Sequence, residues 1–198
     1  MTKRERVLAA LQGKPVDCVP AGFSLHFPKD KNSGEAGVQA HLTFFQETDT
    51  DLVKIMNENL VPNQGAIRTP EDWACIGPIT RETPFIQKQL EFTKKILDRC
   101  DPDAYSLGTL HGITASAIHP IEADYGYDPV RTLLTEHLRA NSAPVLDAMK
   151  RIADGMCQLA WGYKEAGVDG VYYAALGAET RSFTDEEFDR WIAPLDKL

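Results

Sequence analysis

The feature that most constrains the fold is a regular alternation of short apolar runs with helical stretches. The runs at residues 19–27, 51–56, 105–110 and 168–174 are rich in the apolar and aromatic residues typical of buried strands. Strands that alternate with helices pair in parallel through right-handed crossovers. The sequence therefore predicts an α/β fold, either as a small open sheet or as a TIM (β/α)8 barrel. In the second case the chain covers about the first half of the barrel, as four strand–helix units.

Cap and breaker residues delimit the expected helices. Thr2 and Glu5 have the spacing of a capping box, and Gly167 follows the last turn of a long apolar stripe. Helices are expected at residues 2–11, 38–47, 70–74, 84–99, 130–140, 144–166 and 184–194. The stretch 111–129 is expected to be a loop that follows the third strand.

The composition is that of an ordinary globular protein. The 198 residues are 43% hydrophobic and 25% charged, and no linker or low-complexity tract divides them, so a single α/β domain over residues 1–198 is expected. A net charge of -8 argues against nucleic acid as a partner. No apolar run approaches the roughly 20 residues that span a membrane, and the N-terminus lacks the apolar segment of a signal peptide. We therefore expect a cytoplasmic protein.

The four cysteines are widely and irregularly spaced, at positions 18, 75, 100 and 157. The chain contains neither a CxxC nor a His-x-Cys pattern, so the local sequence does not indicate a metal cluster. Buried free thiols are the expectation for a reducing compartment.

The strongest functional lead is the run DLVKIMNEN at residues 51–59. An apolar strand breaks here into Asn57, Glu58 and Asn59, which would lie at its C-terminal tip, where α/β folds place their chemistry. Glu58 can act as a general acid or base, or stabilise a cationic intermediate. Alternatively it caps a helix or binds a loop. The two asparagines can orient a substrate, or they are turn residues.

Further candidate substrate-binding residues lie at or after the other expected strands. His26 ends the first strand and His111 ends the third, and either can bind an anionic group or move a proton. Alternatively both are hydrogen-bonded rim residues. Tyr172 and Tyr173 are consecutive on the fourth strand, so only one of them can point to the interior. Glu179 follows in the next loop.

Several segments carry a family resemblance. They are TKRERVLAALQGKPVDCVPAGF near the start, and GVDGVYYAALGAE and FTDEEFDRWIAPLDK near the end. They resemble the uroporphyrinogen decarboxylase superfamily, which contains uroporphyrinogen decarboxylase and the corrinoid methyltransferases. The resemblance covers essentially all 198 residues, and only the N-terminal part of a family barrel. It implies an enzyme that binds a tetrapyrrole or a corrinoid-linked substrate at the carboxyl ends of the strands.

The resemblance also suggests roles for particular residues. In NENLVPNQG, Glu58 stands where the decarboxylase has a catalytic aspartate. His119 lies three residues before Glu122, where the decarboxylase has a tyrosine, so Glu58 and His119 are the implied catalytic residues. The decarboxylase binds substrate carboxylates through arginines after its first strand. The matching stretch here, AGFSLHFPKDKN, offers only His26 and two lysines.

The missing arginines favour corrinoid-dependent methyl transfer, because fixed guanidinium groups are the best partners for many carboxylates. The alternative is uroporphyrinogen III decarboxylation, a lyase reaction of porphyrin biosynthesis. The methyltransferase branch binds zinc through a His-x-Cys and a later cysteine, which the resemblance places beyond Leu198. No cofactor is therefore expected on this segment alone; zinc and a corrinoid would require the remaining strands. A corrinoid protein is a possible partner.

A non-catalytic alternative also follows from the sequence. A truncated half-barrel would leave open sheet edges and would act through assembly, with a homo-oligomer as one outcome. A generic phosphate- or sugar-binding barrel is a weaker hypothesis, because the chain has no glycine-rich phosphate loop.

Overall fold

The computed structural model describes residues 1–177 and 179–198. The chain forms two compact units. The first unit comprises Met1–Glu58, Gln87–Thr109 and Ala160–Tyr172, and the second comprises Asn59–Ile86, Leu110–Leu159 and Tyr173–Leu198. The expectation of one domain over residues 1–198 stays a prediction.

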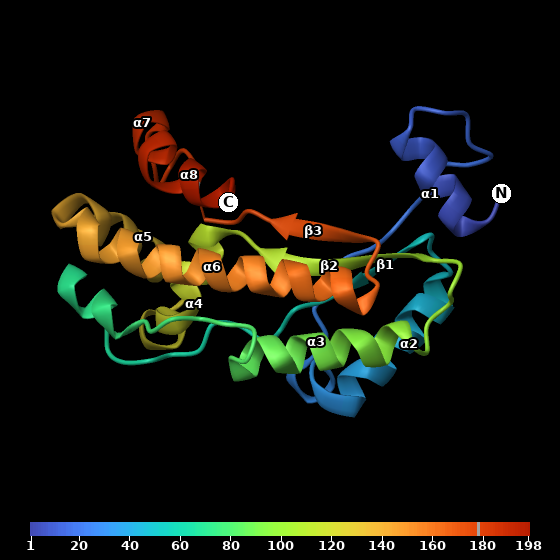
Figure 1. Cartoon of the computed structure of the whole chain (residues 1–198), viewed down its shortest axis with the longest axis horizontal. Helices are drawn as coiled ribbons and strands as arrows, with labels where there is room; N and C mark the ends of the chain where they lie inside the picture. Colours follow the sequence, from blue (N-terminus) through green and yellow to red (C-terminus); the bar gives the residue numbers. More distant parts are fainter. Residues whose placement is uncertain (178) are drawn as a thin grey trace. The chain divides into compact units, whose positions relative to one another are not determined.

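Most expected helices form close to their expected bounds. The helices are α1 (Lys3–Leu11), α2 (Gly34–Thr48), α3 (Pro84–Leu97), α4 (Ile113–Tyr125), α5 (Tyr127–Ala140), α6 (Ser142–Ala166), α7 (Asp185–Glu187) and α8 (Ala193–Asp196), with 3-10 helices at Lys29–Lys31 and Pro70–Cys75 and a π-helix at Phe188–Ile192 (Figure 1). The capping box of Thr2 and Glu5 is confirmed, and Thr69 and Thr184 form similar boxes. None of the described helices is both long and apolar enough to cross a membrane.

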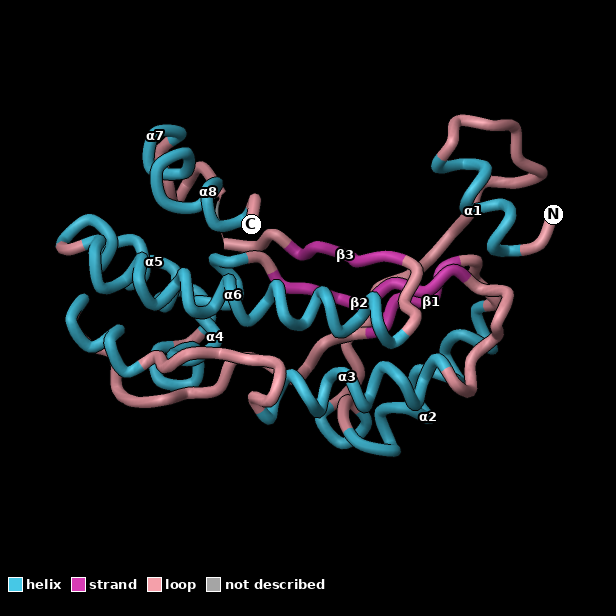
Figure 2. The backbone as a smooth tube through the Cα atoms, viewed as in Figure 1, coloured by secondary structure: helices cyan, strands magenta, loops and turns pink. Residues whose placement is uncertain are grey.

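The strands of the described residues form one parallel sheet. Its members are β1 (Leu52–Ile55), β2 (Tyr105–His111) and β3 (Gly170–Ala174), in the order β1–β2–β3 (Figure 2). In the first unit, β1 and β2 are paired from Leu52 opposite Tyr105 to Ile55 opposite Gly108. The α/β class predicted from the alternation of runs is therefore confirmed.

The expected strand at residues 19–27 is wrong. The segment is extended, but only the Ala21 carbonyl joins it to the neighbouring backbone, by accepting the N–H groups of Asp51 and Leu52 at 3.0 and 3.1 Å. A ladder needs such bonds at repeated positions, and one carbonyl does not supply them. Described residues thus provide three of the four expected strands.

The core of the first unit lies between β1 and the two helices α2 and α3. Its buried members are Val38 and Phe45 of α2, Val53 and Ile55 of β1, Phe92 and Ile96 of α3, and Ala104. Figure 1 shows α2 and α3 side by side, as this cluster requires. Complete burial of a side chain such as Ile55 contributes about 1.5–3 kcal/mol, so this cluster holds β1 firmly against its helices.

The end of α6 and helix α1 fix the other strands of this unit. Tyr163 of α6 donates its hydroxyl to the Thr109 carbonyl at 2.9 Å. A side chain at Gly108 would meet the Tyr163 ring at 2.8 Å, so only glycine permits this approach. Arg4 of α1 pairs with Asp169, whose carboxylate also accepts the backbone N–H of Ser106 at 2.8 Å. One carboxylate therefore connects α1, β2 and the start of β3.

In the second unit, the loop expected at 111–129 is wrong. Most of this stretch is helix α4, and Pro120 lies inside it. Proline removes one helical hydrogen bond and usually ends a helix. Here the helix continues because it buries Ile113, Ile118 and Ile121, each at most 3% exposed. Tertiary burial outweighs the local breaker signal.

The long helix α6 supplies much of the second unit's core. Its expected apolar stripe from Val145 is confirmed as far as Leu159, because Val145, Met149, Ile152, Met156 and Leu159 are all buried. Trp161, expected at the end of this stripe, is instead 57% exposed. A side chain at Gly155 would meet Ile79 at 2.3 Å, which shows how closely the segment before α3 approaches this helix.

Candidate functional site

The C-terminal end of β1 is held in place by two helices of the first unit. His41 of α2 is 1% exposed; its Nε2 accepts the Met56 N–H at 3.2 Å and its Nδ1 donates to the Gly37 carbonyl at 2.8 Å. Gln89 of α3 donates to the Met56 carbonyl at 3.0 Å. Both backbone groups of Met56 are thus fixed just before Asn57 and Glu58. This is the rigid support that a functional strand tip needs.

Glu58 meets His26 at this tip. His26 Nδ1 lies 2.8 Å from Glu58 Oε1. The Glu58 side chain is 21% exposed and the His26 side chain is 71% exposed. The carboxylate is therefore partly buried, whereas the imidazole ring is open to solvent. Two residues that the sequence nominated separately therefore form one pair.

Lys54 lies beside this pair and was missed from the sequence. Its ammonium donates to Ser24 Oγ at 2.6 Å and contacts Met56 Sδ at 3.4 Å. It also lies 4.1 Å from the centre of the Tyr172 ring, a cation–π distance. A lysine in the middle of the apolar run DLVKIM was the available signal, because a strand this buried rarely carries a charge.

Burial makes Lys54 unusual electrostatically. The residue is only 9% exposed, and burial lowers its pKa, while the negative charge of Glu58 opposes that shift. No carboxylate of the described residues comes within ion-pair distance of its ammonium. A buried cation without a paired anion is costly, and such groups are concentrated at functional sites. We call His26, Lys54, Glu58 and Tyr172 the tip cluster.

The extended segment before α2 presents alternate residues to two sides. Ser24 accepts a hydrogen bond from Lys54 of the tip cluster, and His26 belongs to the cluster. Leu25 and Phe27 instead line a groove of about 560 Å³ along α2, together with Phe44. Although the segment is not a strand, its alternation is that of extended backbone. The groove is therefore lined by a different set of side chains from the same segment.

The candidates of the second unit form a separate group. The rings of His111 and His119 are perpendicular, with centres 4.9 Å apart. Burial, and then the neighbouring His111, lowers the pKa of His119 to about 3. His119 is therefore neutral near pH 7 and brings no positive charge to a ligand. Its catalytic role stays a prediction.

Tyr173 contacts the C-terminal helix rather than a neighbour on the sheet. Its hydroxyl donates to Asp196, whose carboxylate also accepts the Ile113 N–H at 3.1 Å. Burial and this carboxylate raise the pKa of Tyr173. Glu179 is exposed. These contacts make Tyr173 a structural link between β3 and α8.

The two asparagines of the tip fall in different units. Asn57 is 3% exposed at the end of the first unit, directly after the fixed Met56. Asn59 opens the second unit and is partly exposed. Their proposed role in orienting a substrate stays a prediction.

The described residues do not fit a zinc site. No three histidine, cysteine or acidic side chains gather within them. Burial raises the pKa of the thiols of Cys75, Cys100 and Cys157, whereas a zinc ligand must be a thiolate. No step through zinc is therefore assigned to these residues.

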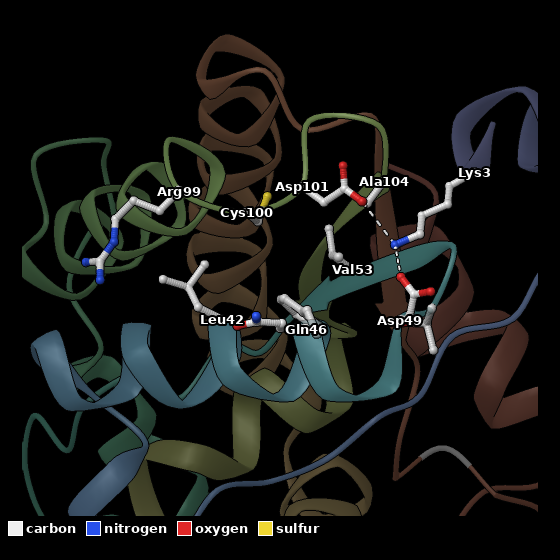
Figure 3. Close-up of a pocket in the computed structure, with 11 residues that line it drawn as sticks. Lys3, Leu42, Gln46, Asp49, Val53, Arg99, Cys100, Asp101 and Ala104 are labelled. Carbon is white, nitrogen blue, oxygen red and sulfur yellow. Dashed lines mark hydrogen bonds and ion pairs between the residues drawn. The ribbon is translucent and has the colours of Figure 1, made fainter.

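A polar pocket of about 270 Å³ lies at the opposite end of β1 (Figure 3). Lys3 crosses it and pairs with Asp49 at 2.6 Å and Asp101 at 3.0 Å. Arg99 lies at its edge, away from this triad. The charges of the pocket are thus largely satisfied, and it is at the amino end of the strand, where barrel folds place stability rather than chemistry.

Comparison with known proteins supports the fold. No protein-family model matches the chain, and no curated protein matches its sequence. A solved structure, the methyltransferase from Methanosarcina mazei, is similar with a TM-score of 0.67 and 18% sequence identity. The match covers 98% of this chain and 65% of that methyltransferase. At this identity the likeness shows a shared fold and no more.

Proposed function

We propose that this chain is part of a barrel enzyme that acts in corrinoid-linked methyl transfer, in the manner of the uroporphyrinogen decarboxylase superfamily. The fold likeness to a methyltransferase supports the proposal, and so does the resemblance of three sequence segments to that superfamily. The single observation that carries it is the tip cluster, since it gathers a buried cation and a carboxylate–histidine pair at the C-terminal end of a strand.

Each residue of the tip cluster has a separate role in this proposal. Lys54 holds an electronegative group of the ligand, with Tyr172 stacked against its ammonium. Glu58 orients His26, whose exposed ring accepts or donates a proton at the ligand. The corrinoid, when bound, supplies the methyl group. His41 and Gln89 keep the tip rigid through Met56.

Decarboxylation of a carboxylated porphyrin is the second candidate. The observation that favours it is Lys54, a buried ammonium that can hold a carboxylate where the family arginines are missing. One lysine is a weaker clamp than paired guanidinium groups, so it ranks second.

An absorbance titration separates the candidates. The chain is titrated with cobalamin, whose side chains are mostly amides, and with uroporphyrin, whose side chains are carboxylates. We expect a spectral shift with cobalamin, and about tenfold weaker binding by Glu58→Gln, because an amide is a weaker hydrogen-bond partner for the His26 ring than a carboxylate is. Glu91→Gln, an exposed change on α3, serves as the matched control.

The opposite results are equally informative. A shift with uroporphyrin alone moves the proposal to the decarboxylase branch. No shift with either compound contradicts the tetrapyrrole ligand class. Equal affinity of Glu58→Gln and the native chain would reduce Glu58 to a structural strand tip.

A further inference from the structure

Arg131 of α5 is a buried cation with unused donors. The residue is 6% exposed, and its guanidinium is stacked 3.8 Å from the centre of the Tyr127 ring. Neither Nε nor Nη1 has a hydrogen-bond partner among the described residues. Asp128 lies 3.8 Å from Nη1, which is too far for a hydrogen bond, and its side chain is 84% exposed. Solvent therefore screens this one nearby charge.

Thr114 of α4 offers a third unused group beside Arg131. It is 2% exposed, and its Oγ1 also has no hydrogen-bond partner in the described part of the chain. A Cβ atom at Gly177 would lie 3.0 Å from Thr114 Cγ2 and 3.6 Å from Arg131 Nε. The Thr114 methyl group and the Arg131 Nε thus both lie beside the backbone of Gly177, which has no side chain to separate them.

All of these residues belong to the second unit and none is part of the tip cluster. Thr114 stands in the first turn of α4, directly after the C-terminal end of β2. This is the positive end of the helix dipole. The Ile113 N–H is already taken by Asp196, so the unused capacity rests with Arg131 and Thr114.

The chemistry of the unused groups defines the ligand. A buried unpaired donor costs about 1–3 kcal/mol and a buried charge more. Arginine can only donate, and a threonine hydroxyl can donate. A group that only accepts hydrogen bonds and carries negative charge matches the chemistry of these unused donors.

We propose that Arg131 and Thr114 form a binding site for an oxyanion group, a carboxylate or a phosphate, beside Gly177. The site is independent of the proposed methyl transfer, because its residues and its unit are different. It takes the anionic part of a small molecule, and Tyr127 shields the guanidinium on one side.

Thermal unfolding at constant ionic strength tests the site, with sodium chloride replaced stepwise by sodium phosphate or sodium acetate. We expect one of these anions to raise the Tm of the native chain by about 2 °C or more at saturation. Arg131→Met should weaken binding of the anion at least about tenfold, and Thr114→Val should weaken it about threefold. Arg139→Met, on the same helix but exposed and paired with Glu187, is the matched control and should keep the full response.

A second measurement needs no destabilising variant. The Nε–H resonance of Arg131, assigned with Arg131→Lys, should move on addition of the anion in the native chain. A response to phosphate alone identifies a phosphate site, and a response to acetate alone identifies a carboxylate site. A native chain that responds to neither anion, or Arg131→Met that retains the native response, would overturn the proposal.

Discussion

At the scale of single residues, Lys54 contrasts with its neighbours on β1. Val53 and Ile55 are buried against α2 and α3 and stabilise the unit. Lys54 points to the other face, where it loses hydration without gaining a carboxylate partner. An apolar residue of similar length would serve stability better, which agrees with the ligand-binding role proposed for Lys54.

Lys54→Met should therefore separate stability from binding. We expect the free energy of unfolding to stay the same or rise by about 1 kcal/mol, since a buried charge is removed. Affinity for cobalamin, the ligand class proposed above, should fall about tenfold. Denaturant unfolding and absorbance titration measure the two effects, with the exposed Lys95→Met as control. Loss of stability without loss of affinity would assign Lys54 a structural role.

A different prediction concerns His41, because both nitrogens of its neutral ring form hydrogen bonds. Nε2 accepts the Met56 N–H, so His41→Phe leaves that buried donor unpaired. We expect a loss of about 1–3 kcal/mol in the free energy of unfolding. The exposed change Gln39→Ala, on the same helix, should cost less than about 0.5 kcal/mol. Equal costs for the two variants would show that the Met56 bond does not position the tip.

At the scale of elements, α4 shows how packing overrides a local signal. The stretch that contains it was expected to be a loop, and Pro120 lies inside the helix. The helix forms because its apolar residues are buried in the second unit. The same burial encloses His119 and lowers its pKa, so the stability of the folded helix depends on pH.

Acid should destabilise α4 through His119. Its folded pKa of about 3 lies below the ordinary value of 6.5, so the neutral form is favoured in the fold. The stability that the neutral, buried His119 gives the fold is fully present above pH 6.5 and is lost as the pH falls toward 3. Between pH 7 and pH 5 we expect a loss of about 1–2 kcal/mol from this residue. His119→Phe should reduce the fall in Tm over this range; an unchanged fall would contradict the burial argument.

At the scale of the whole molecule, the sheet has two edge strands in the described residues, β1 and β3. Unpaired strand edges invite association with other chains. On β3, Val171 and Tyr172 are 43% and 44% exposed, which is high for residues of a parallel sheet. These exposed side chains make the edge of β3 the place to test for self-association.

The edge of β3 should therefore control self-association. We expect the apparent mass of the chain in size-exclusion chromatography to rise with concentration between about 10 and 200 μM. Val171→Lys should suppress the rise, because a lysine at an edge strand opposes pairing. Trp161→Lys removes an exposed apolar residue from a helix and should leave the rise unchanged. A monomer at all concentrations would contradict association through the sheet edge.

Much of the fold could be predicted because its signals are local. The caps at Thr2 and Thr69 act within one helical turn, and the apolar run of β1 is visible in six residues. The tip at Glu58 followed from the same run. Lys54 was missed because its role depends on contacts with Ser24 and Tyr172, which are distant from it in the sequence.

The sequence by itself determined most of the helices, three of the strands and the position where a strand ends in a carboxylate. These outcomes depend on propensity, periodicity and caps, which act over a few residues. Only the tertiary structure decided that residues 19–27 lack a ladder, that Glu58 meets His26, and that Arg131 and Thr114 converge beside Gly177. Each of these depends on hydrogen-bond partners and burial supplied by segments far apart in the chain, which no local pattern contains.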